Sequence, residues 1–393
     1  MRIGIIGGAL QGMEATYLST KAGYETLVLD RRKDAPALSL ADETLVVDVE
    51  KDRGSALKAL ADCDVLLPAN EEIGALRTIT EMAKRAGVPL LFDLDAYTVS
   101  ESKIRSNELL QRLGVPIPRK WPSCGFPVVV KPSTGSGSCG VAKASSEEEM
   151  SRMVRRLREE GSQPVVEEYV NGPNISIEVV GNGENFTPYV ITEIVLDDNY
   201  DCKRVYSPYR SSDPVHEEFT KCAVETARAL KIKGIMDMEA IVVDGKPRVL
   251  EIDARIPSQT PAAILHSHEI NLVKEMVEAM NGRPRKSFVS QKARASVYEH
   301  VRIDGGVMRS CGEGAFAGVH SPRIIRGIFG ADEMITDYRP GTKTWVATIM
   351  ISADDRGSLL KRRVDCLNRI MEENSITEHL DPFPEGYDDS VDR

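Results

Sequence analysis

Two acidic segments near the middle of the chain, residues 234–243 and 248–255, restrict its fold more than any other feature. The intervening Asp-Gly-Lys-Pro at 244–247 consists of turn formers, so the segments are predicted to pair as a β-hairpin. Side chains alternate along a strand, so each segment gathers its acids on one face. These acids are Asp237, Glu239, Glu251 and Asp253, with Arg255 following them. Carboxylates this close repel one another, so we expect a divalent metal ion there; a strand pair salt-bridged to Arg255 is the alternative.

The composition indicates a globular protein of several domains. A chain of 393 residues is too long for one hydrophobic core, so two or three domains are expected. A formal net charge of −10 repels a phosphate backbone, which argues against nucleic acid as a partner. The seven cysteines form no Cys-x-x-Cys pair and no apolar run approaches the length of a membrane span. We therefore expect reduced thiols, no membrane segment and a cytoplasmic protein.

Residues 1–98 alternate short apolar strands with helical segments, which predicts a doubly wound parallel sheet that binds a substrate. The turn after the first strand, residues 7–12, resembles a dinucleotide-binding fingerprint, and Asp30 ends the second strand where a ribose-binding acid would stand. Ala9 replaces the glycine that lets the backbone approach a pyrophosphate. An NAD-dependent oxidoreductase is the alternative from a different class.

Residues 99–172 are predicted to form a small α+β lobe. One strand ends at Lys131 and runs into a segment rich in glycine and serine, residues 132–140, whose backbone N–H groups suit phosphates. This segment is not a Walker loop, because no Gly-Lys-Ser/Thr follows; a flexible surface turn is the alternative. A later strand, residues 164–170, ends at a turn and indicates a hinge between lobes.

Three further stretches complete the expected organisation. Residues 173–300 form a second lobe around the acidic hairpin, with one helix from Pro261 to Met280. Residues 301–378 form a C-terminal α+β extension. Residues 379–393, which are rich in acids, proline and glycine, are expected to be a poorly ordered tail.

Three motifs follow one another in the chain: the lysine strand with its glycine-rich flap, the Glu-Glu-Tyr-Val at 167–170, and the carboxylate hairpin that ends in arginine. Together they resemble the ATP-grasp ligases. The resemblance implies α/β and α+β architecture: an ATP-grasp fold of two lobes that enclose ATP, after an N-terminal doubly wound parallel-sheet domain. Residues 1–300 also look like the ligase family of pyrrolysine biosynthesis, most specifically in Pro-Ser-Gln-Thr-Pro at 257–261. Other similar stretches are Ala69-Asn70-Glu71, Tyr200-Asp-Cys202, Lys233-Gly-Ile-Met-Asp237 and Tyr298-Glu-His300.

The resemblance also implies roles for individual residues. ATP would be bound by Lys103, Lys131, Ser138, Cys139, Glu167, Glu168, Tyr169 and Val170. Two Mg²⁺ ions would be held by Glu239, Glu251 and Asp253. A donor substrate would contact Glu178, Asp237, Arg255, Ser258, Gln259, Thr260 and Glu299, with Arg255 also the catalytic residue that braces an acylphosphate. The acceptor amine would be bound by Leu10, Gln11, Asn70 and Glu71.

The implied function is an ADP-forming carboxylate–amine ligase. It would join the carboxylate of 3-methyl-D-ornithine to the ε-amine of L-lysine through an acylphosphate and give 3-methylornithyl-lysine for pyrrolysine biosynthesis. Another ATP-grasp ligase of amino acids or carboxylates is the nearest alternative. The expected partners are 3-methylornithine, L-lysine, ATP and a second copy of the chain in a homodimer.

Overall fold

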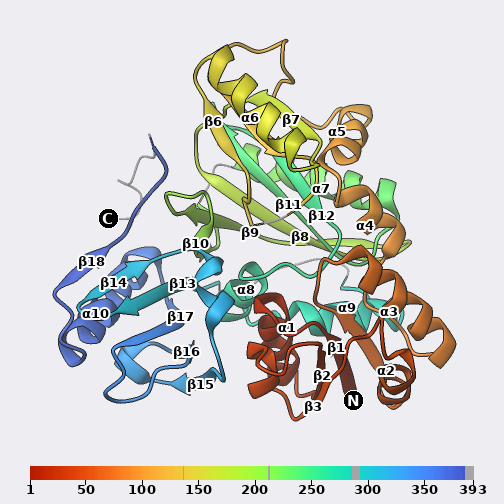
Figure 1. Cartoon of the computed structure of the whole chain (residues 1–393), viewed down its shortest axis with the longest axis vertical. Helices are drawn as coiled ribbons and strands as arrows, with labels where there is room; N and C mark the ends of the chain where they lie inside the picture. Colours follow the sequence, from red (N-terminus) through yellow and green to blue (C-terminus); the bar gives the residue numbers. More distant parts are fainter. Residues whose placement is uncertain (136, 211–212, 286–292, 386–393) are drawn as a thin grey trace.

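A computed structural model describes residues 1–135, 137–210, 213–285 and 293–385 of the chain. Within these residues, three β-sheets organise the molecule: a four-stranded, a three-stranded and an eleven-stranded sheet. Figure 1 shows the N-terminal part (red) and the C-terminal part (blue) side by side at one end, with the three-stranded sheet at the other. None of the helices in the described ranges combines the length and apolar character needed to cross a membrane.

The N-terminal sheet is entirely parallel, as the alternation of strands and helices predicted, in the order β3-β2-β1-β4. Its apolar strands lie between helices that cover both faces (Figure 1). The elements are β1 (Arg2–Ile6), α1 (Leu10–Lys21), β2 (Glu25–Asp30), the short 3₁₀ helix η1 (Pro36–Ser39), β3 (Glu43–Val46), α2 (Arg53–Leu60), β4 (Val65–Pro68) and α3 (Ile73–Ala86).

The glycines of the fingerprint-like turn after β1 allow neighbouring backbone segments to pack closely. Gly7 has φ +117° and faces the carbonyl of Ala69, while Gly12 on α1 faces the carbonyl of Gly7, so a Cβ at either position would collide with backbone. Asp30, the acid at the end of β2, accepts the N–H of Gly8 at 2.6 Å. The carboxylate that a dinucleotide site would use for a ribose therefore holds the turn in place.

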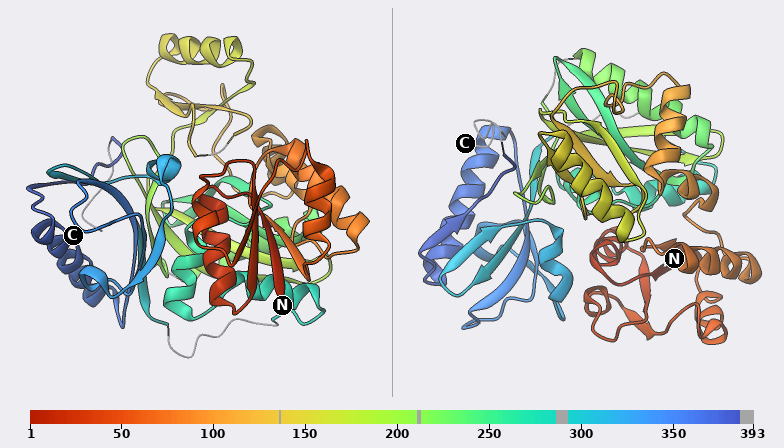
Figure 2. Two further views of the ribbon diagram at one scale, coloured as in Figure 1. Left: turned by 60° about the horizontal axis from the view of Figure 1, so that its bottom comes forward. Right: turned by 45° about the horizontal axis from the view of Figure 1, so that its top comes forward.

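The three-stranded sheet has the antiparallel order β6-β5-β7 and, with its helix, forms what we call lobe A. α6 starts where Ser146 accepts the N–H of Glu149, and it packs Met150 and Leu157 onto the sheet. Figure 2 shows lobe A projecting away from the rest of the molecule. The elements of this region are α4 (Leu94–Ser100), α5 (Lys103–Arg112), β5 (Val128–Pro132), β6 (Ala142–Ala144), α6 (Glu147–Glu159) and β7 (Pro164–Glu168).

The large sheet follows the path β12-β11-β8-β9-β10-β13-β17-β16-β15, and off this path β14 pairs with β13 and β18 pairs with β14. The strands of the first part of this sheet and the helices between them are β8 (Asn174–Asn182), β9 (Phe186–Leu196), β10 (Cys202–Ser207), α7 (Asp213–Leu230), β11 (Lys233–Val243), β12 (Lys246–Asp253), α8 (Thr260–His268) and α9 (Leu272–Met280). The strands of the second part, with the 3₁₀ helices η2 and η3 and the helix α10 between them, are β13 (Ala295–Asp304), β14 (Val307–Ser310), η2 (Glu313–Gly318), β15 (Arg323–Arg326), η3 (Ile328–Gly330), β16 (Glu333–Thr336), β17 (Thr344–Ala353), α10 (Arg356–Glu373) and β18 (Glu378–Leu380). The boundary expected at residue 300 falls inside β13, which hydrogen-bonds to β10 on one side and β17 on the other.

The helix expected from Pro261 to Met280 is two helices. Glu269 ends α8 in a left-handed conformation with φ +56°. Asn271 then begins α9 by accepting the N–H of Lys274 at 3.2 Å. This N-cap was present in the sequence, but the apolar pattern on both sides of it hid the break.

The structure describes the first part of the tail that is expected to be poorly ordered, residues 379–385, and this part contacts the rest of the molecule. β18 pairs in parallel with β14, and Asp381 forms ion pairs with Lys203 at 2.6 Å and Arg204 at 2.7 Å. These partners lie far away in the sequence, so local composition could not indicate them. Residues 386–393 of the expected tail lie outside the described residues.

Candidate active site

The acidic hairpin forms with the predicted pairing. β11 and β12 are joined by Asp244 (φ +51°) and Gly245 (φ +71°), the left-handed pair that a tight hairpin requires. The acids that face each other are Asp237 with Asp253 and Glu239 with Glu251. Residues directly opposite across a ladder share a face, so these four carboxylates, which we call the acidic platform, lie together on one side of the sheet.

Only part of the platform has a nearby cation. Lys103 at the start of α5 lies 3.0 Å from Glu251, and Arg255 lies 2.9 Å from Asp253. Asp237 is buried, and its Oδ1 has no hydrogen-bond partner among the described residues. An unpaired buried carboxylate oxygen costs free energy, so its position needs a reason other than stability.

The pKa values of the platform report the same excess of negative charge. Burial raises the pKa of Glu239 to about 8, and the charges of Glu251 and Asp253 add to the shift. Burial also raises the pKa of Asp253 to about 6, although Arg255 opposes the change. For Glu251, burial alone would raise the pKa, but Lys103 and its neighbours outweigh it and lower the pKa. The platform therefore attracts further positive charge.

The platform faces a cavity of about 240 Å³ between lobe A and the large sheet, which we call the first cavity. All the residues predicted to bind ATP, the platform and most of the predicted donor-side residues line it. They are Lys103, Lys131, Ser138, Cys139, Glu167, Glu168, Tyr169, Val170, Asp237, Glu239, Glu251, Asp253, Arg255, Ser258, Gln259 and Thr260.

The two acids at the end of β7, next to the predicted hinge, each form an ion pair with a basic side chain. Glu167 forms an ion pair with Lys131 of β5, and both side chains are buried. Glu168 is held by Arg119 at 2.7 Å. The backbone N–H groups of Glu168 and Tyr169 also have partners, since they donate to the carbonyls of Arg119 at 2.8 Å and Pro127 at 3.2 Å.

The glycine-rich flap contacts both lobes. Gly135 (φ +104°) accepts a hydrogen bond from Lys103 at 2.9 Å through its carbonyl. The hydroxyl of Ser138 donates to the carbonyl of Tyr200, between β9 and β10, at 2.6 Å. Cys139 is exposed, and Ser136 lies outside the described residues. The flap thus spans the first cavity.

A second cavity, of about 450 Å³, lies at the carboxyl ends of β1, β2 and β4. Doubly wound sheets bind ligands at this edge. The residues predicted to hold the acceptor amine, Leu10, Gln11, Asn70 and Glu71, all line it. The Oδ1 of Asn70 is buried without a hydrogen-bond partner among the described residues.

The two cavities meet at three side chains that line both, Arg255, Ser258 and Glu313. Arg255 joins them by pairing with Asp253 on one side and Glu71, at 2.6 Å, on the other. The hydroxyl of Ser258 donates to Glu313 at 2.9 Å. Glu313 was not predicted, because it belongs to no motif; it is the first residue of η2, shortly after the end of β14.

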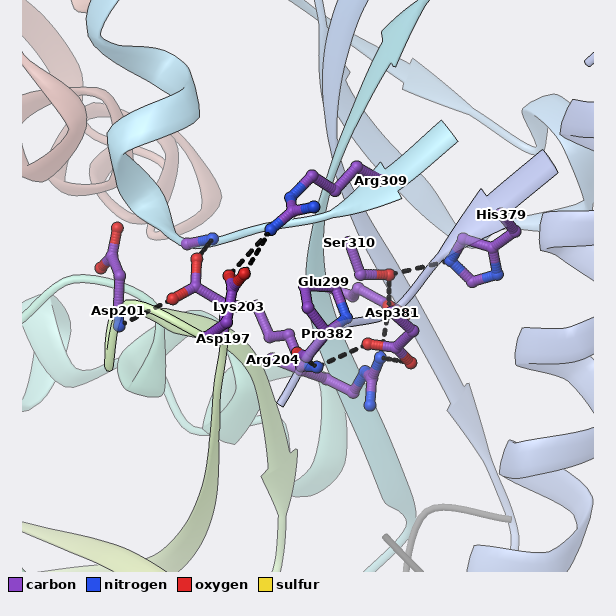
Figure 3. A network of polar contacts seen from close by, with 12 residues as sticks. Asp197, Asp201, Lys203, Arg204, Glu299, Arg309, Ser310, His379, Asp381 and Pro382 are labelled. Carbon is purple, nitrogen blue, oxygen red and sulfur yellow. Dashed lines mark hydrogen bonds and ion pairs between the residues drawn. The ribbon is translucent and has the colours of Figure 1, made fainter. Parts of the chain in front are cut away.

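Two predicted donor-side residues lie elsewhere. Glu299 lines neither cavity. Arg204 at 2.8 Å and Arg363 at 2.6 Å neutralise its carboxylate, and Ser310 donates to it at 2.8 Å. Figure 3 shows Glu299 with Arg204 and Ser310. It therefore cannot serve as the free acid that an ammonium group needs. Glu178 is also absent from both linings; it is buried on β8, in the row that continues from Asp253 through Asp237, and burial raises its pKa to about 7.

The platform suits a hard cation. In the arrangement seen, no group of three or more His, Cys, Asp or Glu side chains within the described residues could hold a metal ion. Lys103 and Arg255 contact Glu251 and Asp253 there, so an ion would require them to release those carboxylates. The donor set itself fits Mg²⁺, since it offers carboxylate oxygens in excess of the cations beside them.

Comparison with known proteins defines the class first. Residues 100–259 match the family model described as an ATP-grasp domain. The fold is similar to the biotin carboxylase domain of 2-oxoglutarate carboxylase from Hydrogenobacter thermophilus, solved as a dimer with MgADP, ADP and bicarbonate. The TM-score is 0.72 with 15% identity, over 93% of this chain and 89% of that one. The fold is therefore the ATP-grasp fold.

The sequence then narrows the class to a family. The chain is 36% identical over 310 residues to the 3-methyl-D-ornithine–L-lysine ligase of Methanosarcina mazei, across 79% of this chain and 80% of that protein. It is 35% identical over 312 residues to the corresponding ligase of Methanosarcina barkeri, across 79% of this chain and 82% of that protein. The chain belongs to this family of ligases.

Proposed function

We propose that the protein is an ATP-dependent ligase that joins the carboxylate of 3-methyl-D-ornithine to the ε-amine of L-lysine, within pyrrolysine biosynthesis. The observation that carries the proposal is the meeting of two cavities at Arg255: one beside the acidic platform, the other at the edge of the N-terminal sheet. A ligase needs two such compartments, because the carboxylate is activated beside ATP and the amine arrives from elsewhere. Membership of the ligase family supports the choice of substrates.

The chemistry explains why ATP is needed. A carboxylate oxygen does not leave when an amine attacks, whereas phosphate does. Transfer of the γ-phosphoryl group to the donor carboxylate gives an acylphosphate and ADP. Such a transfer depends mainly on positioning and on countercharge for the phosphoryl oxygens.

The residues around the first cavity would supply that countercharge. Lys103 and Lys131 would contact phosphate oxygens as point charges, and Ser138 and Cys139 of the flap would close over them. Glu167, Glu168, Tyr169 and Val170 would border the adenine, and backbone groups of this segment other than the N–H groups of Glu168 and Tyr169 would hydrogen-bond its edge. Flap closure would also keep water from the acylphosphate.

Glu239, Glu251 and Asp253 would hold two Mg²⁺ ions. The platform has an excess of carboxylates and so lacks positive charge for the phosphate oxygens. The two ions would supply that charge. Arg255 would then brace the carboxylate being activated, since a guanidinium offers paired donors to planar oxygens.

The residues that line the two cavities indicate which side chains would bind each substrate. The donor would contact Asp237, Ser258, Gln259 and Thr260. Glu178, which lies beside Asp237 on the neighbouring strand β8, would add negative charge next to this contact. Leu10, Gln11, Asn70 and Glu71 would bind the acceptor. Gln11 already ties the two regions together, because its amide donates to the carbonyl of Ile256 at 2.5 Å.

Release of ADP tests the proposal. We expect it to require 3-methyl-D-ornithine and L-lysine together, and to fall to background when D-alanine, bicarbonate or a purine precursor replaces the pair. Turnover with one of those instead would assign the chain to another ATP-grasp reaction. The expected homodimer stays a prediction, which sedimentation equilibrium of the full chain would test.

A further inference from the structure

Glu313, which no motif indicated, stands where the two cavities meet. It lines both of them, beside Arg255 and Ser258. One carboxylate oxygen accepts the hydroxyl of Ser258 at 2.9 Å. The other lies close to the flap, 3.5 Å from where a Cβ on Gly137 would be. Glu313 therefore reaches the donor segment, the flap and the acceptor cavity at once.

The loop that carries Glu313 is held firmly on both sides of it. The N–H of Gly312 donates to Asp197 and the N–H of Gly314 donates to Asp201, each at 3.0 Å. Figure 3 shows both aspartates on the connection between β9 and β10. A side chain at position 312 would collide with Asp201, so only glycine allows this approach. Such support fixes the direction of the Glu313 side chain, which is a requirement for a catalytic group.

The same support also touches the flap. The connection between β9 and β10 accepts the hydroxyl of Ser138 through the carbonyl of Tyr200 at 2.6 Å. The connection that holds the Glu313 loop therefore also contacts the flap at Ser138.

A second acid, Glu71, lies near the same junction but already has a cation beside it. Its carboxylate is 2.6 Å from the guanidinium of Arg255. Glu313 forms no ion pair with a cation among the described residues, and the neutral hydroxyl of Ser258 donates to it. Of these two acids, Glu313 is the one available to a cationic ligand.

We propose that Glu313 is the base that deprotonates the attacking amine, an assignment that rests on the proposed function. An alkylammonium has no lone pair at neutral pH and must lose a proton before it attacks. One ammonium proton moves to the carboxylate of Glu313, and the freed lone pair forms the C–N bond with the acyl carbon. The C–O bond to phosphate breaks, and a second nitrogen proton leaves with inorganic phosphate. Glu313 afterwards returns its proton to solvent.

Hydroxylamine separates this role from all earlier steps, because it is largely uncharged at neutral pH and attacks an acylphosphate without a base. The test compares wild type, Glu313→Gln and Glu313→Asp, with 3-methyl-D-ornithine and MgATP and with either L-lysine or hydroxylamine as the acceptor. We expect Glu313→Gln to lower amide formation with lysine by about 100-fold or more, within the range that removal of a general base produces. Hydroxamate formation should stay near the wild-type rate, and Glu313→Asp should recover part of the lysine reaction. Glu81→Gln, an exposed acid of the N-terminal domain paired with Arg53 at 3.0 Å, is the matched control.

Each other outcome contradicts the assignment. Equal losses with lysine and hydroxylamine in Glu313→Gln would show that the residue supports activation or the fold. Full activity with both acceptors would show that another group takes the proton. A wild-type protein that forms neither amide nor hydroxamate would overturn the proposed function itself, and the assignment with it.

Discussion

Two groups of buried and half-buried carboxylates in this molecule have opposite surroundings. The acidic platform places four carboxylates beside Lys103 and Arg255, and its Asp237 keeps an unpaired oxygen among the described residues. The C-terminal charge network, by contrast, gives its two carboxylates three cations. Its members are Glu299 and Asp381 with Lys203, Arg204 and Arg363. Figure 3 shows four of its members, Lys203, Arg204, Glu299 and Asp381.

The pKa values separate the two groups in the same way. Burial raises the pKa of Glu239 to about 8 in the platform. Burial would also raise the pKa of Glu299, but Arg204 and Arg363 overcome it and hold the pKa well below its usual value. A carboxylate that the protein has already neutralised stabilises the fold, whereas one left in excess is ready to receive a cationic ligand. Substitutions in each group, added ligands and a change of pH test this distinction.

Glu299→Gln should destabilise the protein by about 3–5 kcal/mol, the usual result of breaking a buried ion pair and leaving its partners charged. Arg204 and Arg363 would then lie buried with one carboxylate fewer. Urea unfolding measures the change. A variant as stable as wild type would show that Glu299 is not the centre of the network.

Glu239→Gln is the matched substitution in the platform and should have the opposite pattern. It removes a carboxylate whose neighbours repel it, so the ligand-free protein should unfold at the same urea concentration as wild type or a higher one. ADP formation should fall by about 100-fold or more, because a group that contacts the metal is lost. Marked destabilisation with unchanged turnover would place Glu239 among the structural acids instead.

Mg²⁺ with ATP should raise the melting temperature, by an amount equivalent to about 2.7 kcal/mol at a ligand concentration 100 times the dissociation constant. EDTA should remove the shift, and Glu239→Gln should reduce it. Differential scanning fluorimetry with NAD as the comparison ligand checks the result. A larger shift with NAD than with MgATP would favour the dinucleotide alternative.

Acid should weaken the C-terminal charge network. The folded-state pKa of Glu299 lies below its ordinary value of 4.5, so its stabilising contribution is complete above that pH and is lost as the pH falls through the folded pKa. Asp381 shifts in the same direction, since Arg204 outweighs its burial. The unfolding free energy of wild type should therefore fall as the pH drops below about 4.5. Glu299→Gln should show a shallower fall; an identical slope would refute the contribution.

A surface pair provides the smallest expected effect. Arg156 of α6 and Glu160, the residue after that helix, lie 2.9 Å apart in an exposed position, where solvent screens their attraction. Glu160→Gln should change neither the melting temperature nor the rate of ADP formation measurably. A loss comparable with that of Glu299→Gln would mean that burial does not decide the worth of these pairs.

The sequence was most informative where structure is local. The hairpin followed from the alternation of its acids and from Asp244-Gly245, which are adjacent in the chain. Sequence could not assign Glu299, because its partners Arg204 and Arg363 lie 95 and 64 residues away. Glu313 was missed for the same reason, as Ser258 is 55 residues distant. Motif residues therefore indicated the platform, while long-range packing decided which other acids join the site.

The fate of oxygen from the donor carboxylate tests the central claim, that the platform activates a carboxylate by phosphorylation. 3-Methyl-D-ornithine labelled with ¹⁸O in its carboxylate is converted with ATP, Mg²⁺ and L-lysine, and the inorganic phosphate is analysed by mass spectrometry. The account predicts one ¹⁸O atom in each phosphate released, together with ADP and an amide product. Label in AMP, or phosphate free of label, would contradict it.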